Sequence, residues 1–345
     1  MLAKIVHTDR DPQGDLKDIT SDIAAITHSE DTVIPWGWYE EGFDKEPTDE
    51  NSGPVDAEGT HAAYVTHHNG PQYFGYISNN PQMYSHLHGM HDFFMAVQHH
   101  TLPAKGVFYI KGGLLNQFNL KPEDPAAQVQ QNFLGDDDHP GYSDSRISES
   151  LVAETVNDIA RSPYWKHCAI IITWDDSEGD YDHVPPPAIT TGPDGKQLTD
   201  GPRVPFLLIS PWSKTHYIDH AVGSQSTVVR FVDEVFNLIP LQKLPDEQKG
   251  IRIGEKKGLA NEGPTDDSPL VTDLLQAFDP ARLTGRAPML PPSYAIIPEK
   301  LVLTQPADLH YGLKQLGIVP TDYALGIHNH IPSDFNPRPS TTPGK

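Results

Sequence analysis

The sequence predicts an α/β protein in which a mostly parallel β-sheet is sandwiched by helices. Short apolar runs rich in β-branched residues recur along the chain, and such runs are typical of strands buried on both faces. They alternate with longer segments whose apolar residues follow a helical period, which indicates parallel strands joined by helical crossovers. The 345 residues, 37% of them hydrophobic, are sufficient for one large domain or two smaller ones.

The first elements are expected in the amino-terminal third of the chain. A short amphipathic helix near Asp18 precedes a strand over 33–38. Residues 40–59 are acidic and rich in Pro, Gly and Asn, so we expect a solvated excursion there. Apolar spacing predicts a helix over 85–99 with one buried face, and the run GVFYI at 106–110 predicts the next buried strand.

The remaining elements of the sheet follow in the middle of the chain. A helical period predicts a helix over 146–162, with Ser145 as its cap. The apolar run at 169–173 and the segment RVPFLLIS at 203–210 predict two more buried strands. Apolar side chains at a helical period predict a further helix over 224–238.

The composition changes after Pro240, where Pro, Lys and Asp become frequent. One further helix is expected at 269–278, and the last residues, 329–345, are expected to be extended and mobile. We therefore predict two domains, a core over 1–240 and a helical and extended extension over 241–345 with a mobile tail.

The net charge of −22 at pH 7 excludes several classes of partner. Nucleic-acid binding needs a basic face, and adsorption to anionic membranes needs a polybasic patch. A phosphate ester can bind only where a metal or several protonated histidines reverse the field locally. The single cysteine, Cys168, excludes an intrachain disulfide and a Cys-based zinc finger.

No stretch of the sequence approaches the ~20 consecutive apolar residues of a transmembrane helix. The amino terminus lacks the apolar centre of a secretory signal, so the chain itself carries no export signal. By these features alone, the chain is expected to stay where it is made.

Two adjacent acids, Asp175 and Asp176, directly follow the apolar strand expected at 169–173. Ligands of open α/β sheets bind just outside the carboxyl ends of such strands. Two carboxylates placed there can hold a divalent cation through hard oxygen ligands, and Ca²⁺, Mg²⁺, Mn²⁺ and Zn²⁺ all fit that description. The alternative is an ordinary polar loop after a core strand.

Histidines are the other candidate groups. His139 lies in the loop GDDDHPGYSD, where acidic neighbours favour its charged form, so it can act as a proton donor. The alternative is an acidic turn that caps the following helix. His67 and His68 are adjacent, so both can reach one site only from a loop or a bulge, and otherwise they are structural.

The motifs of several other enzyme classes are missing from the sequence. It contains no G-x-S-x-G elbow, no Walker loop and no H-E-x-x-H zinc motif. Metal-assisted hydrolysis is therefore the leading chemistry. In that chemistry a cation held by carboxylates stabilises charge on a phosphoryl oxygen, and a histidine protonates the leaving group.

Five segments of the chain match, in order and spacing, the motifs of one protein family. They are IPWGWY at 34–39, YVTHHNGPQYF at 64–74, DHPGYSD at 138–144, SPYWKHCAIIITWDDSEGDYDHVPPP at 162–187 and GPRVPFLLISPWS at 201–213. They resemble the bacterial phosphoesterase family that contains non-haemolytic phospholipases C and respiratory-burst-inhibiting acid phosphatases, within the alkaline phosphatase superfamily.

The resemblance implies an alkaline phosphatase-like core and a role for each candidate residue. Asp175 and Asp176 would be metal ligands, and His139 would face the leaving-group oxygen. His67 and His68 would help to bind the phosphoryl oxygens. The implied substrate is a small phosphate ester or a phospholipid headgroup. The carboxyl-terminal DYALGIHNHIPSDFNPRPSTTPG resembles the acid-phosphatase branch, which favours a phosphatase over a phospholipase C.

Two parts of the family pattern do not occur in the sequence. Family members carry an ENxSFD-type metal-binding segment and a Ser or Thr nucleophile before the segment matched here at 34–39. We therefore expect an N-terminally incomplete core that needs an upstream segment or a complementing amino-terminal chain. The resemblance also implies a periplasmic or secreted protein, with the export signal in the missing portion.

Two functions follow from these expectations. The first is metal-assisted hydrolysis of phosphoric esters, of the acid phosphatase or phospholipase C type. The second is a catalytically inactive remnant or an interaction module that works with an upstream segment or a partner chain.

Overall fold

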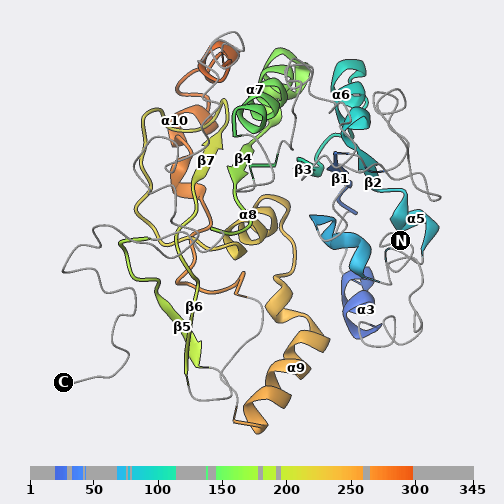
Figure 1. Cartoon of the computed structure of the whole chain (residues 1–345), viewed down its shortest axis with the longest axis vertical. Coiled ribbons are helices and arrows are strands. Elements are labelled where there is room, and N and C mark those ends of the chain that lie inside the picture. Colours follow the sequence, from blue (N-terminus) through green and yellow to red (C-terminus); the bar gives the residue numbers. More distant parts are fainter. Residues whose placement is uncertain are drawn as a thin grey trace, which may run out of the picture. The chain divides into compact units, whose positions relative to one another are not determined.

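A computed structural model describes most of the chain between residues 20 and 297 (Figure 1). These residues belong to one compact unit, Met1–Glu299. A second unit, Lys300–Lys345, which contains the expected mobile tail, lies outside the described residues. The described residues are 20–28, 33–41, 43, 68–74, 77, 80–113, 137–138, 145–177, 182–191, 196–258 and 265–297.

The amino-terminal half of the described chain forms a three-stranded parallel sheet. Strand β1 (Trp36–Glu40) lies between β2 (Leu87–Gly89) and β3 (Val107–Lys111), and both pairings are parallel. Helix α6 (Met90–His99) joins β2 to β3 and is the crossover that parallel strands require. The parallel sheet and its helices confirm the α/β fold class predicted from the sequence.

Helix α6 packs its apolar face against this sheet. Phe93 and Val97 are four residues apart on the helix and both are buried. Phe93 contacts Tyr39 of β1 edge to face, with ring centroids 5.4 Å apart. Helix α7 (Ser145–Arg161) adds Ile159 to the same apolar cluster. Apolar spacing predicted both helices, but the helix expected over 85–99 begins only at Met90, because Leu87–Gly89 form strand β2.

The strands expected at 169–173 and 203–210 are present as a separate antiparallel pair. In this pair β4 (Ile170–Thr173) runs opposite to β7 (Phe206–Ile209). A parallel pair needs a crossover helix, but the described residues between β4 and β7 form only an antiparallel hairpin, β5 (Ala188–Thr191) with β6 (Gln197–Thr199). The alternation of strands and helices stops after β4, and the strand direction reverses there.

Residues beyond Pro240 contribute to the core around α7 and β4. Trp165 is buried with Val156 and Ala295, and its indole donates a hydrogen bond to the carbonyl oxygen of Leu290 at 3.0 Å. The Asn157 side chain exchanges two hydrogen bonds of 2.8 Å with the backbone of Ile297. The described part of the predicted extension therefore packs on the predicted core, and the domain boundary at 240 stays a prediction.

Helix α8 (Ser226–Phe236) packs through Phe231 onto a segment that was expected to be helical. The rings of Phe231 and Phe278 are stacked, with centroids 5.6 Å apart. The prediction of a helix at 269–278 is wrong, because this segment forms turns and a short 3₁₀ helix, η6 (Leu275–Ala277). Leu274 adopts a left-handed backbone conformation with φ of 62°, and the Thr272 and Asp273 side chains accept hydrogen bonds from backbone N–H groups two residues on.

The remaining described elements are short or lie at the edges of this unit. Helices α3 (Thr20–His28) and α9 (Pro245–Lys256) contact each other. The others are α5 (Pro81–Tyr84), α10 (Pro280–Leu283), and the 3₁₀ helices η2 (Gly70–Tyr73), η4 (Pro163–His167), η5 (Leu241–Lys243) and η7 (Pro292–Tyr294). Among the described helices, none combines the length and apolarity needed to cross a membrane.

Candidate functional site

The carboxyl ends of β1 and β3 meet at one edge of the parallel sheet. Glu40, the last residue of β1, is in register with Lys111, the last residue of β3. Glu40 and Glu41 are fully buried, so the expectation of a solvated excursion is wrong for these two residues. The cause is Phe43, which packs in a buried apolar cluster with Leu87. Burial of this side chain also removes the two preceding acids from solvent.

Lys111 connects this edge to the end of β4. Its Nζ is 3.2 Å from Oδ1 of Asp175, which follows β4. The Lys111 side chain is 22% exposed, whereas that of Asp175 is 72% exposed. Partial burial acts to raise the pKa of the Asp175 carboxyl, but the charge of Lys111 and its hydrogen bond outweigh this and hold that pKa below its usual value. Asp175 is therefore a carboxylate at neutral pH.

The end of β4 is also joined to two other parts of the chain. Gln225, the cap residue before α8, donates from Nε2 to the carbonyl oxygens of Trp174 and Asp175, at 2.9 and 3.2 Å. The Trp174 indole donates to Oδ2 of Asp138 at 2.9 Å. Asp138, the residue before His139 in the sequence, is therefore held against the Trp174 side chain just after β4.

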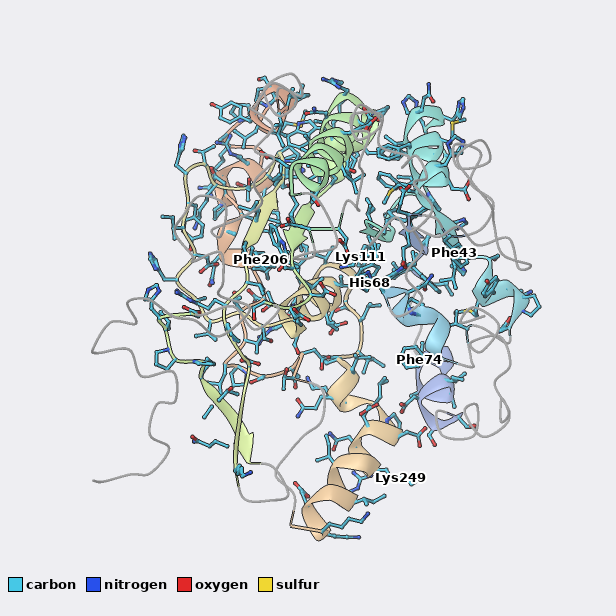
Figure 2. All side chains as sticks on the ribbon, viewed as in Figure 1. Phe43, His68, Phe74, Lys111, Phe206 and Lys249 are labelled. Atoms are coloured by element: carbon cyan, nitrogen blue, oxygen red, sulfur yellow. The ribbon has the colours of Figure 1, made fainter. Side chains whose placement is uncertain are left out.

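His68 lies in the same region of the molecule (Figure 2). Its Nδ1 is 3.7 Å from Oδ2 of Asp137, and both side chains are buried, with 7% and 1% exposed. The charge of His68 also contributes to the lowered pKa of Asp175, so the two groups are within electrostatic range. We call His68, Lys111, Asp137, Asp138 and Asp175 the strand-end cluster.

The predicted site residues therefore divide into those that the structure brings together and those that it does not describe. His68 and Asp175 both belong to the strand-end cluster. Asp176 is exposed beside Asp175. His67 and His139 lie outside the described residues. The chemical roles expected for all of these residues stay predictions.

The described residues do not make a complete metal centre. Among them, no group of three or more His, Cys, Asp or Glu side chains is placed to hold a metal ion. Zinc sites take about four ligands and calcium sites about six to eight. Asp175 and Asp176 supply two carboxylates, and one of these already carries the Lys111 ammonium. A metal at this position needs further ligands from the rest of the chain or from substrate.

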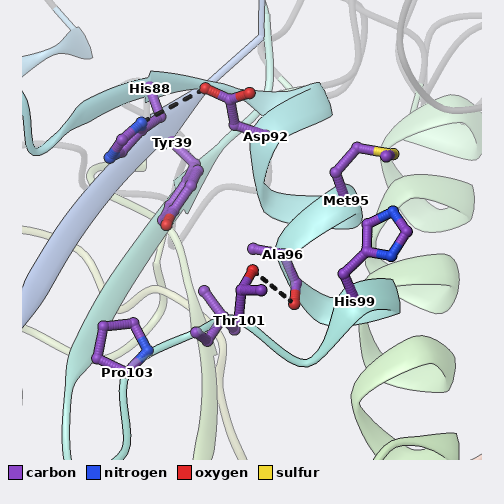
Figure 3. A pocket seen from close by; sticks show the side chains of 9 residues that line it. Tyr39, His88, Asp92, Met95, Ala96, His99, Thr101 and Pro103 are labelled. Atoms are coloured by element: carbon purple, nitrogen blue, oxygen red, sulfur yellow. Dashed lines mark hydrogen bonds and ion pairs between the residues drawn. The ribbon is translucent and has the colours of Figure 1, made fainter.

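A separate pocket of about 490 Å³ lies beside α6, and none of the predicted site residues that the structure describes lines it (Figure 3). His88 Nδ1 is 3.4 Å from Oδ2 of Asp92, and its ring stacks on Tyr39 with centroids 4.9 Å apart. Hydrogen bonding to His88 lowers the pKa of Asp92, although burial opposes this. Burial, followed by the charge of Asp92, raises the pKa of Tyr39 to about 12. These polar groups share the wall of the pocket with the apolar side chains of Met95, Ala96, Leu102 and Pro103.

Sequence reasoning missed Lys111, Asp137 and Gln225. Lys111 ends the apolar strand predicted at 106–110, so the strand-end rule that selected Asp175 also applied to it. Asp137 lies in the acidic loop before His139, where several acids were equally plausible. Nothing in the local sequence distinguishes Gln225, because its role depends on a contact with residues about 50 positions away.

Residues 10–239 match the Phosphoesterase family. The match includes the whole strand-end cluster. It also includes His67 and His139, which lie outside the described residues. It covers about two thirds of the chain.

Curated relatives resemble a shorter part of the chain. Non-specific phospholipase C1 of Arabidopsis thaliana is 34% identical over 124 residues, which are 31% of this chain and 23% of that protein. Non-hemolytic phospholipase C of Pseudomonas aeruginosa is 27% identical over 128 residues, 30% of this chain and 18% of that protein. Non-hemolytic phospholipase C of Burkholderia pseudomallei is 26% identical over 125 residues, 29% of this chain and 17% of that protein. The chain spans about a fifth of the length of these relatives.

Proposed function

The chain belongs to the Phosphoesterase family, and on that premise we propose that it hydrolyses phosphoric esters. The observation that carries the proposal is the strand-end cluster, in which Lys111 and His68 lie beside carboxylates near the carboxyl ends of β3 and β4, in a chain of net charge −22. An anionic phosphoryl group needs a local reversal of the field in such a protein, and a divalent cation at the carboxylates, together with Lys111 and His68, would supply it. The matched relatives are named phospholipases C.

The residues of the chain have distinct roles in this proposal. Lys111 and His68, together with His67, hold the phosphoryl oxygens by charge-assisted hydrogen bonds. His139 donates a proton to the leaving-group oxygen. The hydrogen bond between Trp174 and Asp138 supports this role, because it holds the residue before His139 against the side chain of Trp174, the residue that precedes Asp175.

A divalent metal at Asp175 and Asp176 is part of the proposal. When bound, it would supply electrostatic stabilisation of charge on a phosphoryl oxygen. Its further ligands would come from outside the described residues, because those residues hold no complete ligand set. The preference for a soluble phosphomonoester over a phospholipid stays a prediction. The periplasmic or secreted location also stays a prediction.

The test is hydrolysis of p-nitrophenyl phosphate and p-nitrophenylphosphorylcholine by the purified full chain, with and without Mg²⁺, Ca²⁺, Mn²⁺ or Zn²⁺. We expect metal-dependent turnover that Asp175→Asn abolishes while the variant remains folded, because the side chain is largely exposed. The matched control is Asp267→Asn, which removes a carboxylate from another Lys–Asp pair, Lys243 with Asp267 at 3.0 Å.

The outcomes separate the candidate functions. Unchanged turnover in Asp175→Asn would remove this carboxylate from the site. Turnover that occurs only after an amino-terminal segment is supplied would support the predicted complementing chain. No turnover with either substrate under any of these conditions would favour the inactive remnant or interaction module.

A further inference from the structure

The pocket beside α6 is bounded on one side by the loop at 101–103, and hydrogen bonds hold this loop in place (Figure 3). The backbone N–H of Thr101 donates to the carbonyl oxygen of Ala96 at 2.9 Å, which closes the end of the helix. The Tyr164 hydroxyl donates to the carbonyl oxygen of Leu102 at 3.2 Å. This wall is therefore already ordered, and a ligand would not have to order it on binding. We call this cavity the α6 pocket.

The Tyr39 ring is fixed in one orientation at this pocket. The His88 ring stacks on it with centroids 4.9 Å apart, and the Phe93 ring contacts it edge to face at 5.4 Å. A Cβ atom at residue 37 would lie 2.8 Å from Cε2 of Tyr39, so the ring can lie there only because residue 37 is glycine. The Tyr39 hydroxyl then points toward the loop at 101–103 (Figure 3).

The Tyr39 hydroxyl has no hydrogen-bond partner in the described part of the chain. The residue is only 6% exposed, and buried tyrosine hydroxyls usually have a partner. Burial raises the pKa of this hydroxyl to about 12, so it keeps its proton at neutral pH and acts as a donor. A ligand oxygen that accepts a hydrogen bond would satisfy it.

Asp92 gives the α6 pocket a negative charge. Hydrogen bonding to His88 holds the pKa of this carboxyl below its usual value, so it is ionised at neutral pH. The Asp92 side chain is 63% exposed, so it can accept a second donor beside His88. Among the described residues that line the pocket, none is a lysine or an arginine. A cationic group is therefore favoured at Asp92, and an anionic ligand is disfavoured.

The α6 pocket thus combines an apolar surface with two fixed polar groups, and its volume of about 490 Å³ is typical of small-molecule sites. We propose that it binds a small amphipathic amine. The apolar body of the ligand lies against Met95 and Leu102, its ammonium pairs with Asp92, and an oxygen of the ligand accepts a hydrogen bond from the Tyr39 hydroxyl. No residue of the strand-end cluster lines this pocket, so the proposal does not depend on the hydrolysis of phosphoric esters.

The experiment is isothermal titration calorimetry of the full chain with four related probes. Tyramine carries both an ammonium and a phenolic oxygen. Phenethylamine lacks the phenolic oxygen, tyrosol has a neutral hydroxyl in place of the ammonium, and 4-hydroxyphenylacetate has a carboxylate at that end. We expect tyramine to bind at least about tenfold more tightly than tyrosol and about fivefold more tightly than phenethylamine. The anionic probe should bind most weakly.

Two variants assign these differences to the named residues. Asp92→Asn should weaken tyramine binding about tenfold and leave tyrosol binding unchanged. Tyr39→Phe should weaken tyramine binding about fivefold and leave phenethylamine binding unchanged. The control is Asp158→Asn on α7, which changes another helical carboxylate outside the pocket and should leave tyramine binding unchanged.

Several results would overturn the amine site. They are no binding of tyramine, binding of tyrosol or 4-hydroxyphenylacetate as tight as that of tyramine, and tyramine binding that neither variant weakens. The order of the four probes is measured on the unmodified chain, so the test holds even if a variant fails to fold. Hydrolysis of p-nitrophenyl phosphate is measured separately, and its absence would count against the proposed function alone.

Discussion

At the scale of single residues, the ion pair between Lys111 and Asp175 joins strands of two different sheets. The Asp175 side chain is 72% exposed, so solvent screens the pair. Exposed ion pairs stabilise a fold by about 0–1 kcal/mol. The small contribution to stability means that Lys111 can exchange its carboxylate partner for an anionic ligand with little loss.

We therefore expect Lys111→Gln to raise KM for p-nitrophenyl phosphate about tenfold or more, because a charge-assisted hydrogen bond to the phosphoryl group is lost. The free energy of unfolding should change by less than about 1 kcal/mol. Steady-state kinetics and urea denaturation measure the two quantities. The control is Lys243→Gln, which breaks the Lys243–Asp267 pair and should leave KM unchanged. Equal KM values in the two variants would contradict a substrate-binding role for Lys111.

At the scale of elements, α3 and α9 cap each other at their amino-terminal ends. Asp246 Oδ2 accepts hydrogen bonds from the backbone N–H groups of Ser21 and Asp22, at 2.9 and 3.1 Å. Asp22 Oδ1 in turn accepts from the Asp246 N–H at 2.7 Å. The first N–H groups of a helix have no partner within the helix, and these carboxylates satisfy them across 224 residues of sequence.

Asp246→Ala should therefore destabilise the protein by about 1–2 kcal/mol, which urea denaturation followed by circular dichroism would measure. Asp246→Asn retains an acceptor oxygen and should recover most of that loss. Glu247→Ala, in the same helical turn, is the control for a general loss of negative charge near the helix terminus. Equal effects of the two alanine variants would show that the capping hydrogen bonds are unimportant.

Asp233 on helix α8 is a carboxyl group whose pKa depends on Asp266, a residue from a later part of the chain. Burial raises the pKa of Asp233 from 3.8 to about 7, helped by hydrogen bonding to Asp266 and by its charge. Asp266 is 2% exposed and accepts a hydrogen bond from the Leu241 N–H at 2.5 Å. The folded state therefore favours protonated Asp233.

A raised folded-state pKa contributes stability that is fully present below pH 3.8 and is lost as the pH rises through about 7. We expect Asp233→Asn to be more stable than the unmodified chain at pH 8, by about 1 kcal/mol after allowance for solvent screening. The difference should disappear near pH 4. Thermal unfolding at several pH values measures it. A constant difference across that range would exclude titration of Asp233 as its cause.

At the scale of the whole molecule, local patterns predicted the elements that bury one apolar face. The helices at α6, α7 and α8 followed from apolar spacing, and Asp175 followed from its place after an apolar strand. The helix expected at 269–278 failed because Thr272 and Asp273 form side-chain turns that compete with helical hydrogen bonds. Lys111 and Asp175 are 64 residues apart in sequence, and only the folded chain brings them together. Pairing of that kind depends on tertiary contacts that no local pattern encodes.

The net charge of the molecule leads to a prediction about salt. A charge of −22 repels the p-nitrophenyl phosphate dianion during approach, and salt screens that repulsion over about 10 Å at 0.1 M. We therefore expect kcat/KM for this substrate to rise severalfold as NaCl increases from about 0.02 to 0.2 M. Zwitterionic p-nitrophenylphosphorylcholine is the control and should respond much less, because it carries no net charge. A fall in kcat/KM for the dianion would contradict a governing role of the overall charge in its approach.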